Sequence, residues 1–308
     1  MADPILYTEH AVDVLARAVA LGAAGRRFVL VTSTRIRGGA ARDTGSLAVV
    51  AESGEMTGYM SNGCIDRDIQ LQAQRLLDEG APKTVLRYGE GSPFKDLVLP
   101  CGGSLELLLD PAPDLGDLAR AHGDLAARRG TEIDFALPDA ETRRFAYTPK
   151  PLVALAGRGA VFRATARVVA DAGFAMQLYS PEADDLAALA PVIDAPQVHL
   201  TTPDAAPKLT LDGFAAFLTL FHDHDWEPAL LESALQTEAF FIGSLGSQRT
   251  HQMRLARLAE NGVPEDRLAR LRGPIGLVPS LRNAPYIAVS AVAELVGALP
   301  PAIRQIGA

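Results

Sequence analysis

The sequence is short of cysteine, and it has neither a long apolar run nor an excess of basic residues. Its 308 residues include only two cysteines, Cys64 and Cys101, so a disulfide-stapled scaffold is excluded. The net charge of −8 argues against a general nucleic-acid or anionic-membrane binder. The apolar runs, such as 152–157 and 214–221, are too short to span a membrane. Residues 1–25 lack the apolar stretch of a signal peptide, so we expect a cytoplasmic protein with reduced thiols.

Several familiar catalytic patterns are also missing. The chain contains no C-x-x-C pair, no H-E-x-x-H zinc motif, no P-loop and no Ser-His-Asp order. The composition is that of an ordinary globular protein, with 48% hydrophobic and 21% charged residues. The sequence therefore predicts a folded core, and any functional site must be built from other motifs than these.

Strand and helix patterns divide the chain into two α/β domains. A single core usually stops growing at about 250–300 residues, which 308 residues exceed. Residues 1–112 form the first predicted domain, and 113–150 form a connecting segment that ends at Pro149 and Pro151. Strands and helices alternate over 151–308, a pattern typical of a doubly wound parallel sheet. We expect a Rossmann-like fold for this second domain.

The first cysteine lies in a turn that opens a predicted helix. The helix covers residues 65–78, and Cys64 stands directly before it. A helix N-terminus has unpaired backbone N–H groups and a partial positive charge, which lower a thiol pKa and attract anions. The candidate cofactor contacts in this turn are Ser61, Asn62, Gly63 and Cys64.

The second cysteine and one arginine add to the candidates of the first domain. Cys101 is followed by Gly102 and Gly103, which let the backbone approach a ligand closely. Arg42 lies in the glycine-rich loop 38–45, and its guanidinium can pair with a phosphate. The alternatives are that both cysteines fill space in the core and that Arg42 is an ordinary surface residue.

The second domain opens with a glycine turn. Gly157 and Gly159 follow a predicted strand and precede a predicted helix, which is the context of a Rossmann phosphate turn. Phe162 takes the third glycine position, and the next strand ends at Ser180, where an acidic residue usually holds the ribose. The turn keeps NAD(P) as a candidate ligand, and these two replacements argue against it.

Polar residues follow two further strands of the second domain. His222 and Asp223 are predicted to line a site, because ligands bind at the carboxyl ends of such strands. A divalent metal ion held by 222–225 is one alternative, and Asp225 as a helix N-cap is another. The junction 243–249 has the N–H groups, hydroxyls and arginine of a second anion site. Its candidate residues are Gly243, Ser244, Gly246, Ser247 and Arg249.

These segments, taken in order, resemble the XdhC/CoxI family. The resemblance implies an N-terminal α/β domain of the XdhC/CoxI type followed by a Rossmann-like doubly wound domain. It lies in residues 42–45, 58–64, 99–103, 220–225, 241–250, 273–277 and 287–294.

The resemblance implies an accessory protein rather than an enzyme. Such a protein would bind the molybdenum cofactor, as molybdopterin or its cytidine dinucleotide form, and protect it during sulfuration. It would then deliver the cofactor to an apo-molybdoenzyme of the xanthine dehydrogenase or aldehyde oxidoreductase type. The resemblance places Cys64 and Cys101 near molybdenum. It also implies a cysteine desulfurase and a second copy of the chain as partners, with no nucleic acid and no membrane.

Two other functions stay open at this point. One is an NAD(P)-dependent oxidoreductase that uses the second domain, with His222 as a candidate acid–base group. The other is an assembly factor that only docks to its target enzyme and binds no cofactor.

Overall fold

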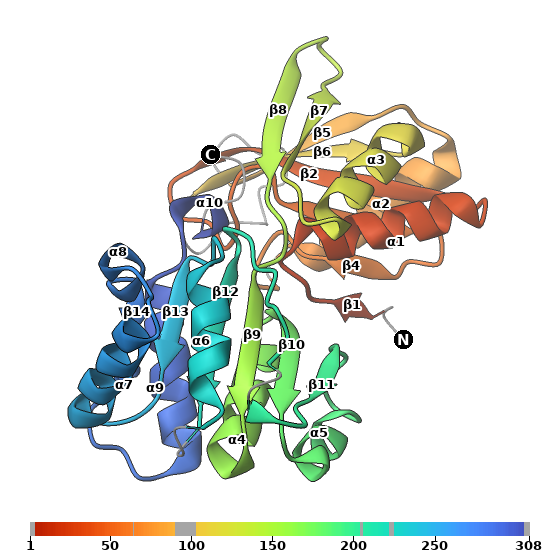
Figure 1. Cartoon of the computed structure of the whole chain (residues 1–308). Coiled ribbons are helices and arrows are strands. Elements are labelled where there is room, and N and C mark those ends of the chain that lie inside the picture. The colour runs from red at the N-terminus through yellow and green to blue at the C-terminus, as the bar shows by residue number, and fades with distance from the viewer. Residues whose placement is uncertain (1–3, 64, 90–102, 204–205, 222–224, 305–308) are drawn as a thin grey trace. The chain divides into compact units, whose positions relative to one another are not determined.

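The computed structural model describes residues 4–63, 65–89, 103–203, 206–221 and 225–304. Within these residues the chain divides into two compact units, one that runs to Lys150 and one over Pro151–Ile303. Both units combine helices with a sheet, so the predicted α/β class is confirmed (Figure 1).

A mixed sheet forms the centre of the first unit. Its strands are β1 (Ile5–Leu6), β2 (Phe28–Arg37), β3 (Leu47–Ala51), β4 (Met56–Gly58), β5 (Thr84–Gly89) and β6 (Ser104–Asp110). The spatial order is β1-β4-β3-β2-β6-β5. Strand β2 pairs antiparallel with β3 and β6, while β1 pairs parallel with β4.

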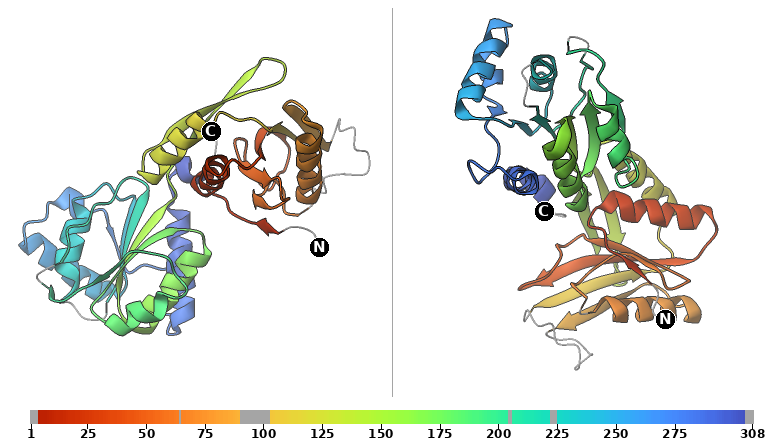
Figure 2. Two further views of the ribbon diagram at one scale, coloured as in Figure 1. Left: turned by 90° about the vertical axis from the view of Figure 1, so that its right-hand side faces the viewer. Right: turned by 90° about the horizontal axis from the view of Figure 1, so that it is seen from below.

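Helices cover both faces of this sheet, because its central strands are apolar on both sides. The helices are α1 (Ala11–Ala23), α2 (Asp66–Glu79) and α3 (Leu115–Ala126). On β2, Phe28 and Leu30 pack with α1 and α3, while Val29 and Val31 pack with α2. Side chains alternate between the faces of a strand, so a run of apolar residues serves two cores. Figure 2 shows α1 and α2 on opposite sides of the sheet.

The segment 113–150 belongs to this first unit. After α3 it forms the antiparallel hairpin of β7 (Thr131–Ala136) and β8 (Thr142–Tyr147). Ile133, Phe135, Phe145 and Tyr147 pack in the same cluster as α1 and α3. The segment therefore adds to a core in addition to linking the two units.

The second unit is a doubly wound parallel sheet, as predicted. Its strands are β9 (Leu152–Gly157), β10 (Ala175–Ser180), β11 (Gln197–His199), β12 (Ala215–Leu220), β13 (Phe241–Ser244) and β14 (Leu271–Arg272). They are all parallel, in the order β11-β10-β9-β12-β13-β14. This order is that of a Rossmann fold, with its switch point between β9 and β12.

Helices lie on both faces of the second sheet. The helices are α4 (Gly159–Asp171), α5 (Ala183–Leu189), α6 (Glu227–Leu235), α7 (Gln248–Glu260), α8 (Glu265–Leu268), α9 (Ala284–Gly297) and α10 (Pro301–Arg304). Helices α4 and α9 pack on the side of β9 that presents Val153 and Leu155. Helix α6 packs on the side that presents Ala154 and Ala156. All six residues of β9 are buried, which explains its continuous apolar sequence.

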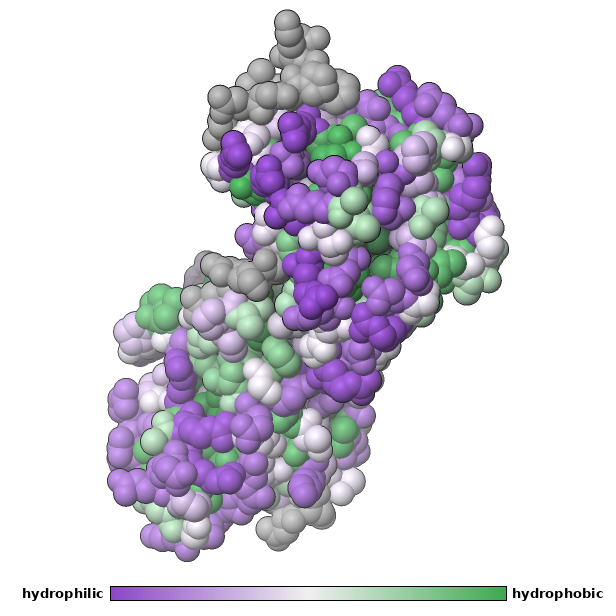
Figure 3. Space-filling model, turned by 90° about the horizontal axis from the view of Figure 1, so that it is seen from above, coloured by the Kyte–Doolittle hydropathy of each residue, from purple (hydrophilic) through white to green (hydrophobic). Residues whose placement is uncertain are grey.

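One face of the molecule has an ordinary mixture of polar and apolar groups. Hydrophilic and hydrophobic residues are intermixed over the face drawn in Figure 3. Among the described residues, no helix has the length and apolar character needed to cross a membrane.

Glycines allow three backbone segments to meet at the end of β5. Gly89 has a φ of +84°, and a Cβ there would lie 2.1 Å from the carbonyl oxygen of Gly103. A Cβ on Gly103 would in turn lie 2.5 Å from the carbonyl oxygen of Gly39. Gly80, at the end of α2, also has a positive φ (+62°), but a Cβ there would meet nothing within 4 Å.

We expect Gly89→Ala to destabilise the first unit much more than Gly80→Ala. Both variants force alanine into the left-handed region, which costs about 1–2 kcal/mol. Only Gly89→Ala also drives a methyl group into backbone, and we expect at least about 2 kcal/mol of further loss. Urea unfolding followed by circular dichroism measures both, and equal losses would contradict the tight approach of Gly89 to Gly103.

Candidate functional site

Strand register brings the predicted motifs of the first unit to one edge of its sheet. Ser104 pairs with both Arg37 and Gly89, so β2 and β5 end where β6 begins. Ala48 pairs with Gly58, so β4 ends where β3 begins. We call this side of the sheet the loop edge. It carries the described parts of three motifs: the Arg42 loop, the 59–63 turn and Gly103.

A buried carboxylate organises the turn before α2. Asp66 is fully buried and accepts hydrogen bonds from the backbone N–H groups of Met60 (2.9 Å), Ser61 (3.0 Å) and Gly63 (3.1 Å). The Ser61 hydroxyl also donates to Asp66 (2.8 Å) and accepts from the N–H of Ile65 (3.1 Å). Ser61 therefore fixes the turn from inside, while Asn62 and Gly63 are exposed.

No role was predicted for Asp66 from the sequence, because the N–H groups of this turn were expected to be open to a ligand. The sequence predicted an open helix start that attracts anions, whereas Asp66 and Asp68 place two carboxylates in the first turn of α2. Asp68 accepts from the Tyr88 hydroxyl (2.7 Å), and burial together with this carboxylate raises the pKa of Tyr88. The signal that could have revealed this was two acids at the first and third helical positions.

The side chain of Arg42 makes its contacts within the first unit. Its Nη2 donates to the backbone oxygen of Glu9 (2.9 Å), and its guanidinium lies 4.5 Å from the ring centre of Tyr59. The Tyr59 hydroxyl donates to the Glu9 carboxylate (3.1 Å), and the ring contacts Tyr7. Burial raises the pKa of Tyr59, and the Arg42 cation opposes that increase. Arg42 thus forms a cation–aromatic stack beside the 59–63 turn.

The glycine turn of the second unit has the predicted strand–turn–helix context. Gly157 ends β9, and Gly159 begins α4 with a φ of +76°. The N–H of Gly159 donates to the carboxylate of Asp185 (2.5 Å), a residue of α5 that the sequence did not single out. A carboxylate of the chain itself therefore occupies a donor that Rossmann domains offer to phosphate.

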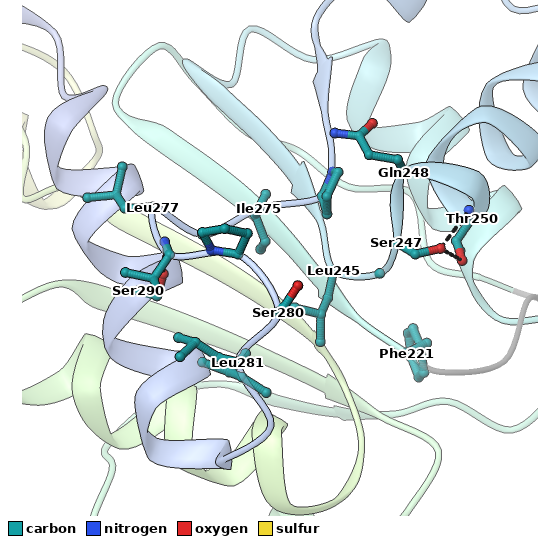
Figure 4. Close-up of a pocket in the computed structure, with 16 residues that line it drawn as sticks. Phe221, Leu245, Ser247, Gln248, Thr250, Ile275, Leu277, Ser280, Leu281 and Ser290 are labelled. Atoms are coloured by element: carbon teal, nitrogen blue, oxygen red, sulfur yellow. Dashed lines mark hydrogen bonds between the residues drawn. The ribbon is translucent and has the colours of Figure 1, made fainter.

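A pocket lies at the carboxyl ends of β12, β13 and β14, on the same edge of the parallel sheet as the glycine turn. Its volume is about 800 Å³, within the range of about 300–1,000 Å³ common for small-molecule sites. It is formed by the start of α7, the segment 274–281 and α9. In Figure 4 the Ser247 side lies across from Leu277, Leu281 and Ser290. The predicted residues Gly246 and Ser247 line it, with Gln248 and Thr250 beside them.

The start of α7 presents donors to this pocket. The Ser247 hydroxyl caps the helix by accepting from the N–H of Thr250 (3.1 Å). In the part of the chain that the structure describes, nothing accepts from the N–H groups of Ser247, Gln248 or Arg249. The predicted residue Arg249 is an exposed cation in the same first turn, but it is not among the residues that line the pocket. Unpaired N–H groups and a positive helix end suit an anionic ligand.

A buried ion pair fixes the position of α7. Glu227 and Arg254, with side chains 3% and 4% exposed, are 2.8 Å apart at their closest atoms. The Glu227 carboxylate also accepts from the hydroxyls of Thr219 (3.1 Å) and Ser244 (3.2 Å), while Arg254 donates to the backbone oxygen of Leu245 (3.0 Å). The pair therefore ties α6, β12 and β13 to α7, and neither member was predicted.

Two predicted contacts of this junction lie in the sheet instead of the pocket. Gly243 and Ser244 are buried within β13, and the Ser244 hydroxyl is bonded to Glu227. A Cβ on Gly243 would lie 2.7 Å from the Ile275 side chain, so this glycine allows close packing. The alternative of an N-cap at Asp225 is wrong, because the N-cap of α6 is Trp226 and the helix has no side-chain cap.

Five predicted residues lie outside the described residues. Phe221, which precedes two of them, lines the pocket. Among the residues that the structure describes, no group of three or more His, Cys, Asp or Glu side chains could hold a metal ion. The five are Cys64, Cys101, Gly102, His222 and Asp223.

Comparisons with known families match both units. Residues 21–89 match the model described as the XdhC and CoxI family. Residues 153–295 match the model described as the XdhC Rossmann domain. The two matched segments lie in the first and second units respectively.

Two relatives and one solved structure extend these matches. The molybdenum cofactor insertion chaperone PaoD of Escherichia coli K12 is 31% identical over 287 residues, covering 88% of this chain and 83% of the relative. The uncharacterized protein YqeB of the same organism is 23% identical over 87% of this chain and 43% of its own length. A crystal structure described as a xanthine dehydrogenase from Bacillus halodurans has a TM-score of 0.75 at 21% identity, covering 94% and 95% of the two chains. This last similarity supports the fold alone.

The buried ion pair makes a prediction about stability. Glu227→Gln or Arg254→Met alone leaves a buried charge without its partner, and each should cost roughly 3–5 kcal/mol. The double variant removes both charges and should cost clearly less than the sum of the single losses. Urea unfolding of the wild-type protein, the two single variants and the double variant gives the coupling energy. The control is Glu182→Gln, which breaks an exposed pair with Arg158 and should cost at most about 1 kcal/mol. Additive losses would contradict the pairing.

Proposed function

The chain belongs to the XdhC and CoxI family, and from this premise we propose that it is a molybdenum cofactor chaperone. It binds the cofactor, protects it during sulfuration and inserts it into a molybdoenzyme of the xanthine dehydrogenase or aldehyde oxidoreductase type. The relative PaoD, 31% identical over 88% of the chain, supports this direction by its name. The observation that carries the proposal is the pocket at the start of α7, where open N–H donors border a volume of about 800 Å³.

The pocket fits the chemistry of this cofactor. The molybdenum cofactor is an anionic pterin dithiolene that carries a phosphate, and its cytidine form carries a nucleotide as well. The N–H groups of Ser247 and Gln248 and the cation of Arg249 provide donors and positive charge for such a phosphate. Leu245, Ile275 and other apolar residues of the pocket provide a surface for a flat ring. When bound, the cofactor supplies the metal centre that the target enzyme requires.

The loop edge of the first unit is the second part of the proposal. In the sequence, Cys64 comes six residues after the end of β4 and Cys101 comes three residues before the start of β6. Both of these strand ends lie at the loop edge. A thiolate is a soft donor suited to a metal or to a transferable sulfur, so these thiols are the proposed molybdenum-proximal groups. The residues on either side of Cys64 are held, because Gly63 donates to Asp66 and Ile65 donates to Ser61.

The partners follow from this role. They are an apo-molybdoenzyme, a cysteine desulfurase and a second copy of the chain. The carboxylate of Asp185 accepts from the N–H of Gly159, which argues against an NAD(P)-dependent oxidoreductase that binds its cofactor at this turn. A docking-only assembly factor would carry no cofactor, and the experiment on the two cysteines separates it from the chaperone.

The first test is the molybdenum and pterin content of protein purified without oxygen from a host that makes the cofactor. We expect near-stoichiometric cofactor in the wild-type protein and at least a tenfold loss in Cys64→Ser or Cys101→Ser, because serine is a poor soft-metal ligand. Ser53→Ala, an exposed change in the β3–β4 turn, is the control. Wild-type protein that carries no cofactor, even after incubation with it, would contradict the chaperone proposal, and titration with NAD(P)H would then separate the oxidoreductase from the docking role.

A second test addresses the α7 pocket by placing a negative charge there. Gln248→Glu puts a carboxylate beside the open N–H groups, where it competes with the phosphate of the cofactor. We expect about a tenfold weaker cofactor retention, equivalent to about 1.4 kcal/mol. Gln252→Glu makes the same change one turn later on α7, outside the residues that line the pocket, and is the matched control. Equal effects of both variants would show that the pocket does not bind the cofactor.

A further inference from the structure

The second unit has the strand order of a dinucleotide-binding domain, and its phosphate turn is occupied by the protein itself. In such domains the pyrophosphate lies at the N-terminus of the helix after the first strand and accepts from its backbone N–H groups. The equivalent helix is α4, and its first residue, Gly159, donates to Oδ2 of Asp185 at 2.5 Å. The acceptor comes from α5, the helix that follows β10.

Asp185 is held firmly in this position. Its side chain is 6% exposed, and its other oxygen, Oδ1, accepts from Nε of Arg163 at 2.5 Å. Arg163 also donates to the backbone oxygen of Asp184 (3.2 Å), which fixes the guanidinium over the start of α5. The carboxylate thus has a hydrogen bond to each oxygen and a cation beside it. An incoming phosphate would lose both donors to Asp185 and would lie next to a like charge.

Two other features of the turn agree with this arrangement. Phe162 stands at the third glycine position, is fully buried, and packs 3.2 Å from where a Cβ on Gly157 would lie. Ser180 ends β10 where an acid would hold a ribose, and it is fully buried. Its hydroxyl accepts from the N–H of Glu182 (3.1 Å), so it is already bonded within the loop. The turn therefore lacks the ribose acid, and the first N–H donor of α4 already has an acceptor within the chain.

We propose that Asp185 is a specificity-determining residue that acts as a fixed internal anion and excludes pyrophosphate-bearing nucleotides from the α4 turn. The domain keeps the Rossmann fold, and the carboxylate replaces the ligand that the fold commonly binds. This inference goes beyond the chaperone role and does not depend on which ligand the α7 pocket binds.

The test is whether removal of the carboxylate creates an anion site. Asp185→Ala frees both the N–H of Gly159 and the guanidinium of Arg163, and Asp185→Asn keeps the side-chain shape while it removes the charge. Isothermal titration calorimetry of the full-length chain with inorganic pyrophosphate and with NAD⁺ measures the result. We expect at least a tenfold gain in affinity for Asp185→Ala over the wild-type protein, and a smaller gain for Asp185→Asn.

The neighbouring residue supplies the control. Asp184→Ala removes an exposed carboxylate from the same turn of α5 and should bind as weakly as the wild-type protein. A second variant, Asp185→Ala with Arg163→Ala, should lose most of the gain, because the freed guanidinium is then absent. Wild-type protein that binds either probe as tightly as Asp185→Ala would overturn the proposal. So would the absence of any gain in both Asp185 variants when their circular dichroism spectra match that of the wild-type protein.

Discussion

Backbone N–H groups at the ends of strands and the starts of helices need acceptors, and this chain supplies many of them from buried or half-buried carboxylates. Asp66 accepts from the turn before α2, Asp185 accepts from the turn before α4, and Glu294 accepts from the N–H of Gly276 at 2.5 Å. A buried donor without an acceptor costs about 1–3 kcal/mol, so Asp66, which accepts from the buried residues Met60 and Ser61, stabilises its turn. Each of the three carboxylates also removes a place where an external anion could bind. The distribution of these acceptors therefore decides both the shape of the loops and the location of open donors.

The start of α7 is different from these three positions. There the cap is the neutral hydroxyl of Ser247, and the nearby carboxylate of Glu227 is directed to Arg254 in the core. The buried pair positions the helix without neutralising its first turn. The pocket beside it is consequently a described site where a positive helix end, open N–H groups and a cavity occur together, although the N–H of Gly276 on its other wall donates to Glu294. This combination is the reason that the proposed cofactor site is placed at α7 and not at the Rossmann glycine turn.

In the first unit the sheet register has a corresponding role. Motifs that are far apart in sequence, around Arg42, before α2 and before β6, leave the same loop edge because their strands run antiparallel. Close backbone approach between Gly89, Gly103 and Gly39 holds two of these segments together. The guanidinium of Arg42 stacks on the ring of Tyr59, so this side chain is part of the structure of the loop edge. The first unit therefore holds the 59–63 turn and Gly103, the described residues beside the two cysteine motifs, at one edge of its sheet.

The sequence by itself determined the α/β class, the doubly wound second domain and the glycine and cysteine motifs, because these depend on local hydrophobic periodicity and turn residues. It also predicted the strand–turn–helix junctions at Gly159 and Ser247. Only the tertiary structure decided which junction stays open, because the deciding partners are distant in sequence. Asp185, which accepts from Gly159, lies 26 residues after it, and Glu227 accepts from Arg254, 27 residues further along the chain. A local pattern reveals a donor, but whether a carboxylate of another helix reaches it depends on packing. For that reason the helix starts were predictable and their occupancy was not.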